Sequence, residues 1–339
     1  APSPDMPMPL FERILNQFNS PDSRPGFDRI ECLSLQGVGE PLLHPRALDM
    51  LALGKAKGMR TMFVSNMTLL SPTAAERLVE MEHDLIVASV DTVDPALMAS
   101  IRRGVHFDLV ARIERNIALL QEAKARAGAK HPEIMVAAIL MKSTVAGAPA
   151  LVERMKALGI KHIAFTHLYS EEKELDVRLS DGVPLAEQSL SSVPPEELHT
   201  IIERIKALDS PECLIEMPQE SWDGAEQLRA KAVFTCLELW SRPFITSEGI
   251  VTPCCYAPYP WIFPMGSLKL QPFEDIWFGP GFQNLRRRHL TGMYPPRCAA
   301  CPQLRHVVAA NDPRLRDACP EPVFLGDRAC SFRPRKRNA

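Results

Sequence analysis

Short apolar segments and amphipathic segments alternate along the first half of the chain. Patterns typical of strands lie at residues 30–35, 60–65, 84–90, 133–141 and 161–168. Helical patterns lie at residues 10–18, 46–57, 72–81, 109–127 and 149–158. Strands that are separated by such helices pair in parallel, because each helix carries the chain back across the sheet. The alternation therefore predicts a parallel α/β sheet with right-handed crossovers, either open or closed into a barrel.

The alternation begins with a helix rather than a strand. A parallel barrel that starts with its helix leaves unpaired the sheet edge at which a first strand would lie. We therefore expect the first strand and the loop after it to be missing from this chain.

Composition limits the classes of function that fit the chain. The 339 residues suffice for one large domain or two modest ones, and 46% of them are apolar, which supports a sizeable core. No apolar run is long enough to span a membrane. The formal net charge of −2 gives no argument for bulk binding of nucleic acid. We expect neither nucleic acid nor a membrane as a partner.

The turn after the first predicted strand contains groups that suit a ligand. Gly37 and Gly39 lack a Cβ and so allow a ligand to approach the backbone closely. Glu40 follows on the turn, and Pro41 stiffens its exit. Ligands of α/β proteins bind at the carboxyl edge of the sheet, where this turn lies. On turn chemistry alone, however, a Gly-x-Gly sequence after a strand is more often only a turn.

Cysteine is concentrated toward the C-terminus. Of the nine cysteines, Cys32 and Cys213 stand alone, and the other seven lie between Cys236 and Cys330. This distribution is not typical of a secreted disulfide scaffold. It favours metal ligation in a reducing compartment, and we expect a cytoplasmic protein.

Four of these cysteines have the spacing of a ligand set. Cys298 and Cys301 form a Cys-x-x-Cys turn, which lets two thiolates point at one metal centre. Cys236 and Cys254, which lies five positions after Gly249, can complete four-coordination from a hairpin. Four soft sulfurs suit either zinc or an iron–sulfur cluster, and the spacing alone does not choose between them.

Three short motifs follow successive predicted strands. Residues 37–41 are Gly-Val-Gly-Glu-Pro, residues 64–69 are Val-Ser-Asn-Met-Thr-Leu, and residues 89–91 are Ser-Val-Asp. In this order they resemble the GGEP, TNGTLL and SLDG motifs of the radical S-adenosylmethionine (SAM) enzymes that carry a C-terminal SPASM or twitch auxiliary-cluster extension. Val38 replaces one glycine of the first motif.

The resemblance implies that S-adenosylmethionine binds at these strand ends. The implied cofactor-binding residues are Gly37, Gly39, Glu40, Pro41, Ser65, Asn66, Ser89, Asp91 and Arg102. In the family the GGEP turn holds the methionine amino group. The residues of the second and third motifs would then lie near the ribose and the methionine, and Arg102 would pair with the methionine carboxylate. Taken singly, each is equally consistent with a strand-end cap or a surface arginine.

The C-terminal cysteines also follow the order of the family's extension. The resemblance implies one auxiliary 4Fe-4S cluster, rather than zinc, with the ligands Cys236, Cys254, Cys298 and Cys301. Cys255 is the reserve ligand.

The fold class implied is a partial (β/α)6 TIM-like barrel, without its first strand, followed by a small Cys-rich auxiliary-cluster domain. We place the barrel at residues 1–209, a linker at 210–231, the iron–sulfur domain at 232–310 and a tail at 311–339.

The family's Cys-x-x-x-Cys-x-x-Cys loop, which binds the cluster that cleaves S-adenosylmethionine, is absent from residues 1–339. No cysteine precedes Cys32, and Cys32 lies within a predicted strand. In the family this loop follows the first strand, so the missing loop and the missing strand are the same gap. We expect the chain to be a truncated part of a longer protein. A second 4Fe-4S cluster is expected only if that loop is present.

The function implied is that of a radical SAM oxidoreductase or maturase. Such an enzyme cleaves S-adenosylmethionine to a 5′-deoxyadenosyl radical, which abstracts hydrogen from a peptide or small-molecule substrate, and a reductase or flavodoxin-type protein donates the electron. No catalytic residue is assigned, and His167, Tyr169 and Asp223 are unranked candidates for accepting a substrate proton. The alternative is a non-catalytic or degenerate module that binds an iron–sulfur cluster or zinc.

Overall fold

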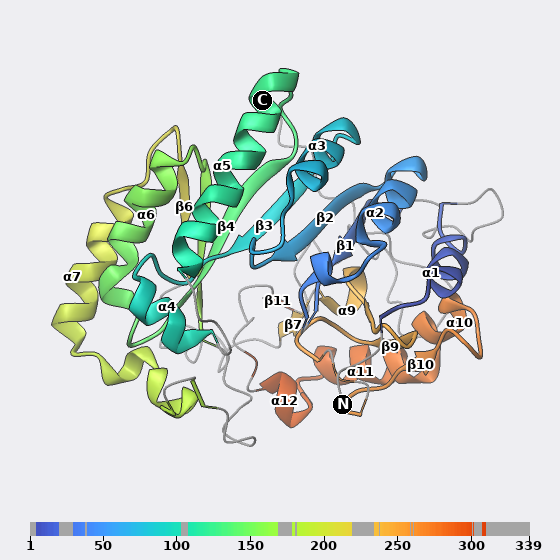
Figure 1. The fold of residues 1–339 in the computed structure, drawn as a ribbon. Helices are drawn as coiled ribbons and strands as arrows, with labels where there is room; N and C mark the ends of the chain where they lie inside the picture. Colours follow the sequence, from blue (N-terminus) through green and yellow to red (C-terminus); the bar gives the residue numbers. More distant parts are fainter. Residues whose placement is uncertain are drawn as a thin grey trace. The chain divides into compact units, whose positions relative to one another are not determined.

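The computed structural model describes most of the chain. The described residues are 5–19, 30–37, 39–102, 108–168, 178–179, 182–218, 234–236, 238–257, 259, 261–299, 301 and 307–309. The chain divides into two compact units (Figure 1). The larger unit is residues 32–220, and the smaller unit combines residues 1–31 with residues 221–339. Within the described ranges, no helix is both long enough and apolar enough to cross a membrane.

A six-stranded parallel sheet forms the centre of the larger unit (Figure 1). Its strands are β1 (Cys32–Leu35), β2 (Arg60–Ser65), β3 (Leu85–Ser89), β4 (Glu133–Leu140), β5 (His162–His167) and β6 (Leu214–Glu216). They lie side by side in the order of the sequence, and every neighbouring pair is parallel. This order is that of an (α/β) barrel wall. The prediction of a parallel α/β sheet is therefore confirmed.

Helices connect these strands. They are α2 (Ala47–Ala56), α3 (Pro72–Glu80), α4 (Pro95–Ile101), α5 (Leu109–Ala127), α6 (Ala148–Ala157) and α7 (Pro195–Lys206). Short 3-10 turns lie at Pro41–Leu43, Val145–Gly147, Leu185–Gln188 and Leu190–Ser192. Local signals set the helix ends: Ser71 Oγ accepts the Ala74 N–H at the start of α3, and Gly128 ends α5 with φ +62°.

In the described part of the larger unit, β6 and α4 were not predicted. Strand β6 has three residues, of which only Ile215 is buried, so it is too short to show an apolar period. Helix α4 carries a signal that could have identified it, because Asp94 precedes Pro95. The Asp94 Oδ1 accepts the N–H groups of Ala96 at 2.8 Å and Leu97 at 3.0 Å, as an N-cap does.

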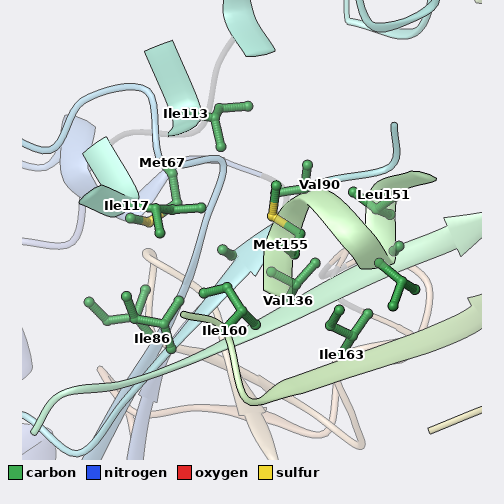
Figure 2. Packing of buried hydrophobic residues seen from close by; sticks show 14 of the residues in the cluster. Met67, Ile86, Val90, Ile113, Ile117, Val136, Leu151, Met155, Ile160 and Ile163 are labelled. Atoms are coloured by element: carbon green, nitrogen blue, oxygen red, sulfur yellow. The ribbon is translucent and has the colours of Figure 1, made fainter. Parts of the chain in front are cut away.

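The main hydrophobic core lies where the helices pack on this sheet. Figure 2 shows Val136 of β4 and Ile163 of β5 near Leu151 and Met155 of α6. Buried and partly exposed residues alternate along β4, as they do in a strand with one face on the core.

A buried histidine lies at the amino ends of β2 and β3. His83 Nε2 is 3.0 Å from the Leu85 carbonyl oxygen, and Nδ1 is 2.8 Å from Thr61 Oγ1. Because a carbonyl can only accept, Nε2 carries the hydrogen and Nδ1 accepts from the hydroxyl. Burial lowers the pKa of His83 to about 4, so the ring is neutral in the folded chain near neutral pH.

We expect acid to destabilise the larger unit through His83 between about pH 6.5 and pH 4. The ordinary pKa is 6.5 and the folded value is about 4, so in this interval the unfolded chain binds a proton that the folded chain does not. The free energy of unfolding therefore falls as pH falls, by about 3 kcal/mol over the whole interval. Chemical denaturation at pH 7.5 and 4.5 measures this loss. The His83→Gln variant cannot titrate there and should lose less; an equal loss in both proteins would contradict the assignment.

The smaller unit has two short antiparallel sheets. Within the described residues, strands β8 (Phe244–Ile245), β9 (Ile250–Thr252) and β10 (Gly266–Ser267) form one of them, in the order β10-β9-β8, and β7 (Phe234–Cys236) pairs with β11 (Val307–Ala309) in the second. Its helices are α1 (Met8–Leu15), α9 (Glu238–Ser241), α10 (Phe273–Trp277), α11 (Pro280–Leu290) and α12 (Pro296–Ala299).

Helix α1 and the residues after it pack against C-terminal parts of the same unit. Arg13 Nη2 donates to the Leu268 carbonyl at 2.7 Å, and Gln17 Oε1 accepts the Phe273 N–H at 2.7 Å. The rings of Phe18 and Phe273 meet edge to face, with their centroids 5.1 Å apart. The domain boundaries placed at 209 and 231 remain a prediction, since residues 219–233 lie outside the described ranges.

Candidate functional site

Glu40 ties the turn after β1 to the end of β2. Its Oε1 accepts from the Ser65 hydroxyl at 2.9 Å and from the Leu42 N–H at 3.0 Å. Its Oε2 accepts the Asn66 N–H at 2.7 Å. Both carboxylate oxygens are thus held by protein donors, which fixes the turn that contains Gly39.

The backbone at Gly39 borders open space. Among the residues that the structure describes, no heavy atom outside Gly39 and its chain neighbours lies within 4 Å of the position that a Cβ on Gly39 would take, and Gly37 and Gly39 are both exposed. Pro41 begins the 3-10 turn that leaves the site. Val38 lies outside the described residues. The first motif therefore offers exposed backbone beside a carboxylate that is already hydrogen-bonded.

The turn after β2 is closed by its own side chains. Ser65 Oγ accepts the Met67 N–H at 2.9 Å, and Asn66 Oδ1 accepts from the Thr68 N–H at 2.9 Å and the Thr68 hydroxyl at 2.6 Å. Met67 has φ +59°, in the left-handed region that favours glycine. In this turn Met67 stands at the position of the glycine in the TNGTLL motif.

Asp91 joins the ends of β3 and β4 and positions an arginine. Its side chain is 4% exposed; Oδ2 accepts from Arg102 Nη2 at 2.9 Å, and Oδ1 accepts the Ile139 N–H at 3.0 Å. Arg102 Nη2 also donates to Ser89 Oγ at 3.0 Å. The Arg102 side chain is 34% exposed, so a buried carboxylate orients a guanidinium that reaches solvent.

These two groups share one edge of the sheet. Glu40, Ser65 and Asn66 make the first group, and Ser89, Asp91 and Arg102 make the second. Because β1, β2 and β3 are parallel, the residues that end or follow them lie at their common carboxyl edge. His167 ends β5 at the same edge, whereas Tyr169 and Asp223 lie outside the described residues.

The predicted metal ligands come from three elements of the smaller unit. Cys236 ends β7, Cys254 and Cys255 follow β9, and Cys298 lies on α12. Cys301 follows α12, and its N–H donates to the Cys298 carbonyl at 3.2 Å. All five are thiols rather than disulfides, and all are half-buried.

The thiols are close enough to influence one another electrostatically. Burial raises the pKa of Cys255 and of Cys298 to about 11, and raises those of Cys236 and Cys254 as well. Neighbouring thiols add to this effect: Cys298 and Cys301 act on Cys236, and Cys236 and Cys301 act on Cys254. Several thiolates here would repel each other unless a cationic centre lay among them.

Among the described residues, no three His, Cys, Asp or Glu side chains are grouped closely enough to hold a metal ion. By their chemistry, four thiolates suit either zinc or an iron–sulfur cluster.

Charged side chains surround the thiols. Arg288 and Arg297 favour the thiolate form of Cys298, and Arg242 favours that of Cys255. Glu238 is buried, has a pKa raised by burial, and disfavours the Cys255 thiolate. Its Oε1 lies 3.4 Å from Arg242 Nη1. Sequence patterns did not indicate Glu238, because its effect on the pKa of Cys236 and Cys255 depends on how separate segments of the chain meet.

Comparison with known proteins shows what the chain is similar to. Residues 236–302 match SPASM, described as an iron–sulfur cluster-binding domain. The α/β fold with its six-stranded parallel sheet is shared with the solved structures of SuiB and anSMEcpe. The resemblance to radical SAM enzymes that carry a SPASM domain is therefore confirmed.

Particular relatives cover different shares of the chain. The "Tungsten-containing aldehyde ferredoxin oxidoreductase cofactor-modifying protein" of Pyrococcus furiosus is 26% identical over 168 residues, 48% of this chain and 44% of that protein. Streptococcus suis SuiB shares the fold with a TM-score of 0.60 at 16% identity, over 88% of this chain and 65% of SuiB. The chain thus spans less than two thirds of either protein.

A second solved structure, anSMEcpe with bound AdoMet, matches with a TM-score of 0.58 at 16% identity, over 89% of this chain and 75% of that one. SuiB has also been solved with S-adenosylmethionine and with its precursor peptide SuiA. anSMEcpe has also been solved with AdoMet and the Cp18Cys peptide.

We expect single Cys→Ala changes at positions 236, 254, 298 and 301 to abolish the auxiliary cluster, whereas Cys255→Ala retains it. The loss is measured by iron and sulfide analysis and by the visible absorption spectrum of anaerobically purified protein. It should amount to about four irons and four sulfides per chain. Cys213→Ala, which alters a buried cysteine of the larger unit, is the matched control. Retention of the cluster by Cys254→Ala and its loss in Cys255→Ala would exchange the two assignments.

Proposed function

We propose that the protein containing this chain is a radical SAM enzyme that modifies a peptide or a small molecule. The observation that carries the proposal is the set of hydrogen-bonded polar side chains at the carboxyl edge of β1 to β3, in a chain that also matches the SPASM domain. Bound S-adenosylmethionine supplies, on reductive cleavage, a 5′-deoxyadenosyl radical that abstracts hydrogen from the substrate.

In this proposal the site side chains act in two ways. Glu40 and Asp91 shape the edge, because their oxygens are held by protein donors. The exposed backbone at Gly37 and Gly39 and the Arg102 guanidinium would bind the cofactor. Arg102 suits a carboxylate, since guanidinium groups bind carboxylates with paired N–H donors.

In the smaller unit, Cys236, Cys254, Cys298 and Cys301 would hold one auxiliary 4Fe-4S cluster. Support comes from the SPASM match and from the mutual electrostatic influence of these thiols. The electron for S-adenosylmethionine cleavage would come from a reductase or flavodoxin-type protein. Neighbours with bound peptides favour a peptide substrate, and the cofactor-modifying relative favours a small molecule.

We expect Arg102→Gln to raise the dissociation constant of S-adenosylmethionine about tenfold or more, because a charge-assisted hydrogen bond is lost. Equilibrium dialysis with labelled S-adenosylmethionine measures the change. Arg154→Gln is the control: Arg154 also binds a carboxylate, that of Glu114, but through an exposed pair between helices. Equal affinity in Arg102→Gln and the wild type would remove Arg102 from the site.

The activity itself is tested by 5′-deoxyadenosine. Full-length protein, reconstituted with iron and sulfide, reduced with dithionite and supplied with S-adenosylmethionine, is expected to release 5′-deoxyadenosine, which liquid chromatography detects. Residues 1–339 alone are expected to release none, because they contain no Cys-x-x-x-Cys-x-x-Cys loop. If the full-length protein binds a cluster but releases none, the non-catalytic module is the better description.

A further inference from the structure

We propose that Asn116, on helix α5, is a positioning residue for the S-adenosylmethionine site. It holds the backbone of the turn after β2 in the one conformation that aims the Asn66 amide at Glu40. Asn116 itself would not touch the cofactor. The inference rests on the proposed function, because the turn matters for activity only if the cofactor binds at this edge.

The turn contains a backbone conformation that methionine does not favour. Met67 has φ +59°, and an L-residue with a Cβ is strained there, whereas glycine is not. Such a conformation persists only when the surrounding structure determines it. The environment of Met67 must therefore hold it in place.

Helix α5 holds Met67 from both its side chain and its backbone. The Met67 side chain is fully buried, and Figure 2 shows it beside Ile113 and Ile117 of α5. On the same helix, Asn116 Nδ2 donates to the Met67 carbonyl at 2.6 Å, and this bond is buried. A buried carbonyl that loses its donor is destabilised, so the bond opposes rotation of the peptide that follows Met67.

The strained residue is connected directly to the site. The Met67 N–H donates to Ser65 Oγ, whose hydroxyl donates to Glu40 Oε1. The neighbouring Asn66 N–H donates to Glu40 Oε2 at 2.7 Å. If Met67 left the left-handed region, the peptides on both sides of it would turn. The Met67 N–H would then leave Ser65 Oγ, and the hydroxyl that donates to Glu40 would lose its support from the turn. Asn116 thus acts on the site through Met67.

The test compares two amides on the same helix. Asn116→Ala removes the donor to Met67, and Gln121→Ala, the matched control, removes a donor to the Gly159 carbonyl, 3.2 Å away on another loop. We expect the dissociation constant of S-adenosylmethionine for the full-length protein to rise about tenfold in Asn116→Ala and less than twofold in Gln121→Ala. The affinities of both variants are measured well below the midpoint of their thermal unfolding. At such temperatures, a variant that only loses stability keeps the affinity of the wild type.

A second background tests whether the effect passes through Met67. Met67→Gly removes the backbone strain, since glycine takes a positive φ without cost. When Met67→Gly is already present, Asn116→Ala should raise the dissociation constant of S-adenosylmethionine by less than half the fold-change that it causes in the wild type. The same fold loss in both backgrounds, or no loss in Asn116→Ala, would overturn the proposal.

Hydrogen exchange separates this inference from the proposed function. In the wild type the Asn66 amide is bonded to Glu40 and should exchange slowly, and in Asn116→Ala its protection should fall about tenfold. This measurement needs no cofactor. If the wild-type protein fails to bind S-adenosylmethionine, the proposed function fails, while unchanged Asn66 protection in Asn116→Ala would overturn the positioning role by itself.

Discussion

The larger unit depends on two carboxylates that each join the end of one parallel strand to its neighbour. At the carboxyl edge of such a sheet the chain leaves its ladder, and backbone N–H groups lose their partners. Glu40 accepts one such N–H from Asn66, and Asp91 accepts one from Ile139. Both carboxylates also take a side-chain donor, Ser65 for Glu40 and Arg102 for Asp91. Two short side chains thereby set the shape of the edge that we propose as the cofactor site.

Sequence patterns identified the long elements because their signals are local. The strand predicted at 60–65 and the helix predicted at 109–127 have these bounds in the structure, where an apolar period coincides with clear end signals such as Gly128. Strand β6 was missed since three residues cannot show a period. The contact of Arg13 with Leu268 joins residues 255 positions apart, and no local pattern reports such a pair.

The candidate site shows the same limit. Motif order placed the predicted cofactor-binding residues at one edge of the sheet, because the strands that precede them pair in parallel. It did not indicate that the oxygens of Glu40 and Asp91 are occupied by protein donors, nor that Asn116 reaches the Met67 carbonyl from 49 positions away. These are properties of helix–sheet packing. Spacing likewise predicted the four cysteine ligands, whereas the effect of Glu238 on the Cys255 thiol depends on how their two segments meet.

Helix α1 has a consequence for how the protein is made. Leu268, which binds Arg13 of α1, and Phe273, which binds Gln17 just after α1, are synthesised some 250 residues later, after the parallel sheet. The smaller unit therefore cannot finish folding until its C-terminal residues have been synthesised. During that time Leu10 of α1, whose side chain lies beside Gly249 in the folded unit, lacks this native contact and is a site at which a chaperone could bind the nascent chain.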